Sequence, residues 1–150
     1  TAWTCVDEAI SGELAAEVLD RPDETHLELA ASEAGAGVVT ERLVSHLLRT
    51  LCPVTGQPDW GTVLLEYRGP RIDHAGMLKY VASLRREIGF HENAVERIFL
   101  AVSQRCQPEA LRVTGRFFRR GGIDINPTRS SPSAAAVLGM PLGQVRVPGQ

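Results

Sequence analysis

The chain has 150 residues, 43% of them hydrophobic, and its 16 basic and 18 acidic side chains leave a net charge of −2. A chain of this length can bury about two thirds of the surface that it exposes when unfolded, which suits a single domain. The near balance of charge argues against a protein drawn to nucleic acid or to an anionic membrane by a global field. No apolar run reaches the roughly 20 residues of a membrane-spanning helix.

The three cysteines, Cys5, Cys52 and Cys106, are an odd set without the short spacings of metal sites. His46 and Cys106 form no tight spacing with His91 or Cys52, so we expect no metal. Nothing before the cysteines reads as a signal peptide. Reduced thiols and a cytoplasmic location are therefore expected.

Residues 1–37 mix acidic with small residues and end in the pliable stretch ASEAGAGV, which predicts a connector with one short strand over HLELA (26–30). The chain opens with Thr1 rather than Met, in a segment that is already acidic and turn-prone, which suggests a piece of a longer protein. The next segment, VVTERLVSHLLRTL (38–51), fits both a helical face and the alternation of a strand, so periodicity leaves the two open.

The rest of the chain alternates between strand and helix signals. A β-branched and aromatic run at 62–69 predicts a strand, apolar spacings over 77–84 and 95–102 predict two helices, and LRVTGRFF (111–118) predicts another strand. IDIN (123–126) is a further short strand candidate. Residues 131–150 are rich in Ser, Ala, Gly and Pro, and we expect a loosely ordered tail.

One loop combines a thiol with a carboxylate. Cys52 begins a loop stiffened by Pro53 and Pro58, and Asp59 follows seven residues after the cysteine. A thiolate is a suitable nucleophile for an electrophilic carbon such as a nitrile, because it is reactive near neutral pH and can leave again. Taken alone, this spacing fits a buried thiol and a turn carboxylate at least as well.

Two further groups could bind ligands. His91 and Glu92 open the second helix, where Glu suits the helix dipole but could also accept two hydrogen bonds from a guanine-like base. The run from Arg119 to Gly122 suits a phosphate or a solvated strand end. Neither GxGxxG after a strand nor GxxxxGK[ST] occurs, so a nicotinamide cofactor would have to bind unconventionally.

Taken together, three stretches in unbroken order resemble the NADPH-dependent 7-cyano-7-deazaguanine reductases: SHLLRTLCPVTGQPDWGTV (45–63), KYVASLRREIGFHENAVERIF (79–99) and RRGGIDINPTRS (119–130). The resemblance implies an α+β tunnelling fold of order ββααββ, with two helices packed on one face of an antiparallel sheet. It makes residues 38–50 a strand, residues 38–130 the catalytic module and residues 1–37 a leader.

The resemblance also implies a reaction, in which a nitrile is reduced to the 7-aminomethyl compound on the route to queuosine in transfer RNA. The resemblance assigns roles to the matching residues of this chain. Cys52 would form a thioimide with the nitrile, Asp59 would transfer the proton of the cysteine or of the nitrile nitrogen, and His91 would assist proton delivery. His91 and Glu92 would bind the substrate. Arg120 and Gly121 would bind the phosphate end of NADPH.

The main departure lies at the start of the first helix. Single-module members carry Glu-Ser-Lys-Ser there, whereas this chain has Asp73, His74, Ala75 and Gly76. In two-module members the first module carries that motif and the second carries the Cys, the Asp and the His-Glu pair. The chain therefore resembles the C-terminal catalytic module of the two-module type.

This departure implies a companion module or subunit that carries the missing motif, and the family suggests a homo-oligomer without direct nucleic-acid or membrane contact. Phe117-Phe118 also departs from the family, where Tyr-Thr more often precedes the paired arginines. The alternative to an enzyme is a non-catalytic purine-binding or assembly module that keeps a base pocket through Glu92.

Overall fold

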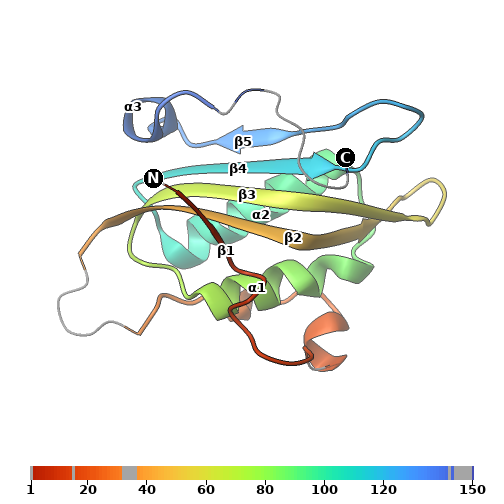
Figure 1. The fold of residues 1–150 in the computed structure, drawn as a ribbon, viewed down its shortest axis with the longest axis horizontal. Helices are drawn as coiled ribbons and strands as arrows, with labels where there is room; N and C mark the ends of the chain where they lie inside the picture. Colours follow the sequence, from red (N-terminus) through yellow and green to blue (C-terminus); the bar gives the residue numbers. More distant parts are fainter. Residues whose placement is uncertain (1, 15, 32–36, 142, 144–149) are drawn as a thin grey trace.

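The computed structural model describes residues 2–14, 16–31, 37–141, 143 and 150. Within them, five strands form one sheet in chain order (Figure 1). The strands are β1 (Trp3–Cys5), β2 (Val39–Leu51), β3 (Pro58–Gly69), β4 (Ala110–Phe117) and β5 (Thr128–Ser130). β1 runs parallel to β2, and each later neighbour pair is antiparallel.

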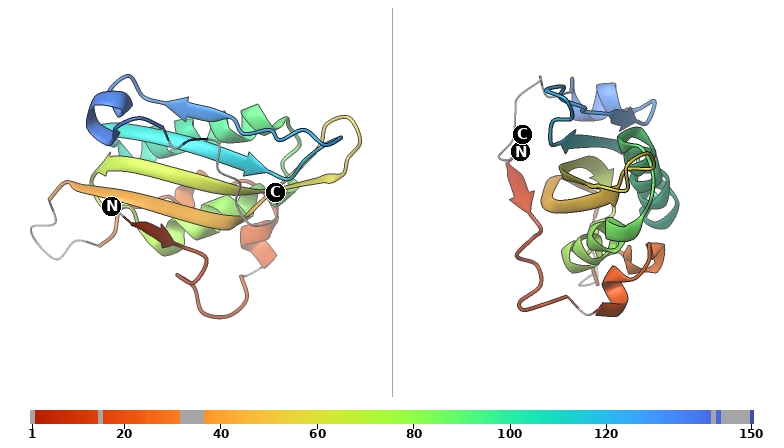
Figure 2. Two further views of the ribbon diagram at one scale, coloured as in Figure 1. Left: turned by 45° about the horizontal axis from the view of Figure 1, so that its top comes forward. Right: turned by 90° about the vertical axis from the view of Figure 1, so that its right-hand side faces the viewer.

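The two long helices cover one face of this sheet. The helices are α1 (His74–Ser83), α2 (His91–Cys106) and α3 (Ala134–Leu138), with 3₁₀ turns η1 (Ala16–Leu19), η2 (Glu24–His26) and η3 (Leu84–Arg86). α1 and α2 pack side by side on one face, while β1 and both chain ends lie toward the other (Figure 2). No helix in the described part of the chain is long and apolar enough to cross a membrane.

The α+β class and most of the predicted elements are confirmed, but the sheet is mixed rather than antiparallel, because β1 runs parallel to β2. The ambiguous segment 38–51 is the strand β2, and both predicted helices form. The strand expected over 26–30 is reduced to a single bridge between Leu29 and Ile72. The expectation for 123–126 is wrong, because Gly121 and Gly122 adopt positive φ in a turn and the strand β5 starts later.

Within the segment expected to be a tail, 131–150, residues Ala134–Leu138 form α3, and Ala134 is fully buried. Gly139 and Gly143 are also described, and their carbonyls accept hydrogen bonds from Arg112 Nη2 at 2.6 Å and Arg116 Nη2 at 2.9 Å. Residues 142 and 144–149 of that segment lie outside the described residues. The described part of this segment therefore lies across β4.

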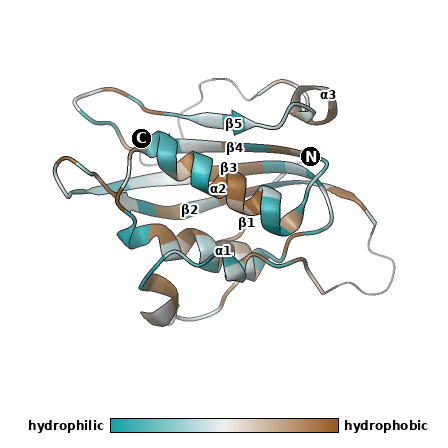
Figure 3. Ribbon diagram, turned by 180° about the vertical axis from the view of Figure 1, so that it is seen from behind, coloured by the Kyte–Doolittle hydropathy of each residue, from teal (hydrophilic) through white to brown (hydrophobic). Residues whose placement is uncertain are grey.

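The hydrophobic core lies between the sheet and the two long helices, which Figure 3 shows crossing the sheet from the helix side. Alternate residues of β4 point into it, namely Leu111, Val113 and Phe117, since side chains along a strand alternate between faces. α2 contributes Ile98 and Val102. Each such buried side chain stabilises the fold by about 1.5–3 kcal/mol relative to exposure.

The opposite face of the sheet is polar yet largely buried. Glu66 lies between two arginines, 3.2 Å from Arg42 Nε and 3.2 Å from Arg112 Nη1. Glu66 and Arg112 are both almost fully buried. Charged groups stay buried only when they are paired, so this face is held by ion pairs and carbonyl contacts rather than by apolar packing.

Candidate active site

The loop between β2 and β3 holds Cys52 at its start. The backbone N–H of Cys52 donates to the Gln57 carbonyl at 2.8 Å, and the N–H of Gly56 donates to the Cys52 carbonyl at 2.9 Å. Gly56 has a φ of +70°, which a glycine adopts without steric cost. The loop thus closes on itself and presents a partly exposed thiol at the end of the sheet.

The surroundings of Cys52 favour the thiolate. A hydrogen bond from the Thr55 hydroxyl lowers the pKa of Cys52, with further help from the backbone N–H groups of Thr55 and Val54 and from the positive charge of Arg120. Burial instead raises the pKa of Cys106 to about 11. Because the thiolate is the nucleophilic form, Cys52 is better prepared for attack than the buried Cys106.

Asp59 is buried near the start of β3, where it pairs with Thr50 in the β2 register. Arg120 Nε donates to Asp59 Oδ1 at 2.7 Å, and Arg120 Nη1 donates to Gln57 Oε1 at 2.9 Å. His91 Nε2 lies 3.3 Å from the same Asp59 oxygen. The carboxylate is therefore flanked by a permanent cation and by an imidazole that can carry a proton.

Backbone hydrogen bonds hold the turn before His91 against the end of β2. His91 is the first residue of α2, and the segment before it runs beside the last residue of β2. The N–H of Leu51 donates to the Glu87 carbonyl at 2.8 Å, and the N–H of Gly89 donates to the Leu51 carbonyl at 3.1 Å. These two bonds join the residue before Cys52 to the turn that starts α2.

The imidazole of His91 is buried and packs against an aromatic ring. The centroids of the His91 and Phe117 rings are 4.2 Å apart, with the planes tilted by 43°. Nε2 is buried and makes no hydrogen bond of good geometry within the part of the chain that the structure describes, although Asp59 lies nearby. A buried polar atom of this kind is rare in folded proteins and suits a group that exchanges protons with a ligand.

A hollow of about 380 Å³ adjoins Asp59 and Arg120, and it is lined by Gln57, Pro58, Asp59, Trp60, Phe118, Arg119, Arg120 and Gly121. Two guanidinium groups and a glycine with positive φ fit the phosphates of a dinucleotide, and the aromatic side chains fit a flat ring. Part of the Arg120 guanidinium is already engaged by Asp59. The exposed Arg119 is the second cation at this hollow.

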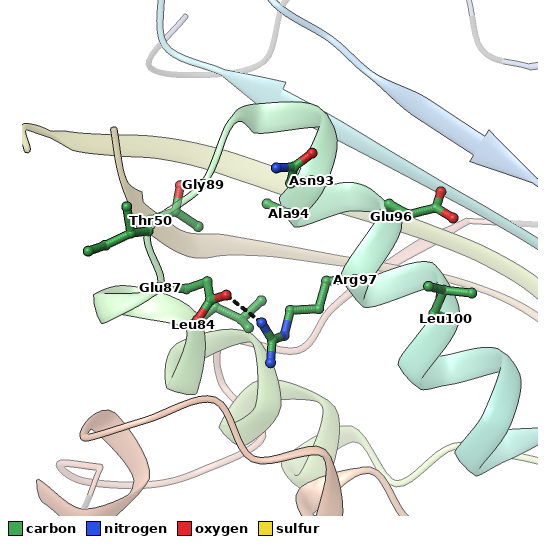
Figure 4. A pocket seen from close by; sticks show the side chains of 10 residues that line it. Thr50, Leu84, Glu87, Gly89, Asn93, Ala94, Glu96, Arg97 and Leu100 are labelled. Atoms are coloured by element: carbon green, nitrogen blue, oxygen red, sulfur yellow. Dashed lines mark hydrogen bonds and ion pairs between the residues drawn. The ribbon is translucent and has the colours of Figure 1, made fainter. Parts of the chain in front are cut away.

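A second hollow, of about 390 Å³, lies beside the start of α2 (Figure 4). Its wall includes Gly89 and Asn93, and an ion pair between Arg97 and Glu87 crosses it. The buried hydroxyl of Thr50, which also lines it, has no hydrogen-bond partner among the described residues. A ligand-sized space therefore borders the turn before His91.

The structure brings Asp59, His91 and Arg120 into contact, and it links Cys52 to them through Gln57. Glu92 is exposed in the first turn of α2 and stands outside this contact set. Thr55, Gln57 and Phe117 were not predicted as site residues from the sequence. A Thr three residues after a loop cysteine is a usable signal, because Ser and Thr hydroxyls often bond within turns, whereas nothing in the sequence pointed to Phe117.

Residues 73–76, which stand where single-module relatives carry Glu-Ser-Lys-Ser, make structural contacts in this chain. Asp73 caps α1 by accepting the Gly76 N–H at 2.7 Å, and His74 Nε2 lies 3.5 Å from Glu41 Oε2. A Cβ at Gly76 would lie 2.2 Å from the His26 carbonyl oxygen, so only glycine lets the leader approach α1 here. In this chain, Asp73 and Gly76 therefore hold the leader and the helix together.

Known proteins resemble this chain closely in sequence. The NADPH-dependent 7-cyano-7-deazaguanine reductase of Stenotrophomonas maltophilia (strain K279a) is 54% identical over 134 residues, which cover 89% of this chain and 48% of that protein. The enzyme of the same name from Burkholderia vietnamiensis is 57% identical over 110 residues, 73% of this chain and 39% of that protein. The chain thus spans less than half the length of these curated relatives.

The fold has a solved counterpart as well. The crystal structure of the archaeosine synthase QueF-Like in its apo form matches with a TM-score of 0.55 at 22% identity, over 63% of this chain and 92% of that one. Together with the observed α+β layout, this likeness confirms the predicted tunnelling fold. The sequence profile of the QueF-like proteins matches residues 58–136, more than half of the chain. The chain belongs to the QueF-like protein family.

Proposed function

We propose that this chain is the catalytic part of an NADPH-dependent nitrile reductase that converts 7-cyano-7-deazaguanine into its 7-aminomethyl product, a step toward queuosine. The observation that carries the proposal is that an activated thiol lies at the same end of the sheet as a buried carboxylate and a buried imidazole, which are 3.3 Å apart. The names of the two relatives support the substrate and the cofactor. We assign the catalytic module to residues 38–130, the leader to residues 1–37 and the tail to residues 131–150.

The first step is addition of the Cys52 thiol across the nitrile. Sulfur bonds to the nitrile carbon, one C–N π bond breaks, and nitrogen gains the proton that sulfur loses, which yields a thioimide. Asp59 carries that proton, because its buried carboxylate lies at the end of the loop that Cys52 begins. Arg120 keeps the carboxylate in place through its Nε donor.

Reduction then needs two hydrides and two protons, and two molecules of NADPH, bound one after the other, would each supply one hydride. His91 delivers a proton to the substrate nitrogen when the thioimide carbon is reduced, since its Nε2 is free of a well-formed hydrogen bond. The Cys52 thiolate leaves, and a proton returns to it after the second reduction. Asp59, 3.3 Å from His91, relays protons between the two sites.

We assign the cofactor phosphates to Arg119, Arg120 and Gly121 at the hollow beside Asp59. Guanidinium groups bind phosphate through paired N–H donors, and the exposed Arg119 is available for this without breaking the contact between Arg120 and Asp59. We assign the base edge of the substrate to Glu92, whose carboxylate accepts two adjacent hydrogen bonds. The proposed reaction takes place in the cytoplasm.

A companion module would cover this end of the sheet. Large apolar side chains stand exposed around the Cys52 loop and the turn before His91, namely Val54, Ile88, Phe90, Phe118 and Ile123. Exposed apolar groups that gather at one place mark interaction surfaces. Relatives about twice as long provide the chain for such a module, and we propose that it carries the Glu-Ser-Lys-Ser type motif within a homo-oligomer.

The test is covalent capture without cofactor. The purified chain is mixed with 7-cyano-7-deazaguanine, and the absorbance difference of the thioimide is recorded, first alone and then with the companion module of a relative. Cys52→Ala should abolish the band. Cys106→Ala is the matched control and should leave the band unchanged, because Cys106 is buried in the core at the end of α2.

Each outcome decides between the proposals. A band that depends on Cys52, with turnover once NADPH and the companion module are added, supports the nitrile reductase. Tight binding without a band or NADPH consumption, even with the companion present, would overturn it in favour of a non-catalytic purine-binding module. A band that survives in Cys52→Ala would show that another thiol is the nucleophile.

A further inference from the structure

We propose that Phe117 is the positioning residue of His91: its ring, seated on Gly61 and Gly115, keeps the imidazole beside the Asp59 carboxylate. This inference rests on the proposed function, because it assigns to Phe117 the placing of the proton donor of that reaction. The geometry that supports it is independent of any ligand.

Two glycines at neighbouring positions of the sheet leave room for the Phe117 ring. Gly61 pairs directly with Phe117 across β3 and β4, and Gly115 lies two residues earlier on the same face of β4. A Cβ at Gly61 would lie 2.9 Å from Phe117 Cδ1, and one at Gly115 would lie 2.6 Å from Phe117 Cε2. The two edges of the ring thus rest on two backbone positions that have no side chain.

Neither glycine is explained by its backbone conformation. The glycines with positive φ in the described chain are Gly12, Gly56, Gly121, Gly122 and Gly139. Glycine in the interior of a strand weakens the strand and often marks the close approach of another group. At Gly61 and Gly115, that approaching group is the Phe117 ring.

The imidazole of His91 packs against that ring. Phe117 is completely buried, and its centroid is 4.2 Å from that of His91. His91 has no hydrogen bond of good geometry at Nε2, so hydrogen bonding at that nitrogen does not fix its orientation. Contact with the Phe117 ring therefore limits the rotation that would carry Nε2 away from Asp59.

The test replaces the flat ring while keeping an apolar core. Phe117→Leu removes the planar surface, Phe117→Tyr retains it, and Phe99→Leu is the matched control, because it makes the same change in α2 two turns after His91. Thioimide formation is measured by its absorbance amplitude. Nitrile reduction is measured with NADPH and the companion module and normalised to that amplitude.

In Phe117→Leu, we expect kcat for reduction to fall about tenfold or more with little change in KM, because small misplacements of a proton donor cost one to two orders of magnitude in rate. Phe117→Tyr should restore kcat. A merely structural role would lower the amplitude and the rate together, and an unchanged normalised kcat in Phe117→Leu would overturn the proposal.

A second measurement does not depend on nitrile chemistry. The ¹⁵N chemical shifts of the four histidine imidazoles report tautomer and mobility, and His91 is identified by the signal missing in His91→Asn. Phe117→Leu should move the His91 signals toward those of a freely rotating imidazole, whereas Phe99→Leu should not. If the His91 signals are the same in wild type and Phe117→Leu, then Phe117 does not position this ring, whatever reaction the protein performs.

Discussion

Gly115→Ala places a methyl group where the structure has no room for one. The new Cβ would lie 2.6 Å from Phe117 Cε2 and 2.8 Å from Val95 Cγ2. Because carbon atoms in contact lie about 3.5–4.0 Å apart, each overlap is roughly 1 Å. Overpacking of this kind costs about 1–3 kcal/mol, and removing a strand glycine returns about 0.5–1 kcal/mol. We expect the free energy of unfolding to fall by about 1–2 kcal/mol.

Urea unfolding followed by circular dichroism measures this change. Gly37→Ala is the control, because a Cβ there would meet nothing within 4 Å, and it should leave the midpoint unchanged or slightly raised. In a Phe117→Leu background, the cost of Gly115→Ala should shrink by at least about 0.5 kcal/mol, the usual coupling between residues in contact. If Gly115→Ala is as neutral as Gly37→Ala, the ring does not rest on Gly115.

Three further predictions follow from the contacts of single side chains. Thr55→Val removes the hydroxyl that chiefly lowers the pKa of Cys52, so the thiolate forms at higher pH and the pH profile of Cys52 alkylation moves to higher pH. Iodoacetamide at neutral pH should label Cys52 well before Cys106, whose pKa burial raises to about 11. Tyr67→Phe should cost about 1–3 kcal/mol in thermal unfolding, because the Tyr67 hydroxyl joins a carboxylate to a buried backbone N–H, whereas Tyr80→Phe should cost less.

Each of these predictions has an outcome that contradicts it. An unchanged alkylation profile in Thr55→Val would mean that the Thr55 hydroxyl does not reach the thiol. Equal labelling of both cysteines in the folded protein would contradict the burial of Cys106. Equal losses in Tyr67→Phe and Tyr80→Phe would be unexpected, since the only hydrogen bond of the Tyr80 hydroxyl in the described residues is a long one of 3.5 Å to the Arg97 carbonyl.

The long elements could be predicted because they bury one face in a regular pattern. The run at 62–69 forms the last eight of the twelve residues of β3, and the apolar spacing from Met77 lies in α1. Short elements could not be predicted in this way. β1 has three residues and is held by parallel pairing to β2. No local sequence pattern predicts that pairing. β5 was misplaced because Ile123 is exposed on the turn that follows Arg120 rather than paired in the sheet.

For the site, the resemblance supplied what local patterns could not. Cys52 and Asp59 alone favoured a structural interpretation, and only the order of three motifs favoured a catalytic role. The geometry then added partners that depend on the fold. Gln57 links the thiol loop to Arg120, and Phe117 meets His91 across 26 residues of sequence because α2 packs on β4. Such pairings follow from the packing of helices on the sheet, which the sequence does not specify position by position.

The hairpin of β2 and β3 has a consequence for how this site assembles during folding. Cys52 and Asp59 both belong to that hairpin, so their mutual placement needs only contacts between residues close in sequence. His91 and Arg120 arrive through contacts between distant segments, which close later and open more easily because their loop-closure entropy is larger. Native-state fluctuations that detach the start of α2 from the sheet would therefore leave Cys52 and Asp59 in their relative positions. His91 would be displaced from the site while Cys52 stayed in place.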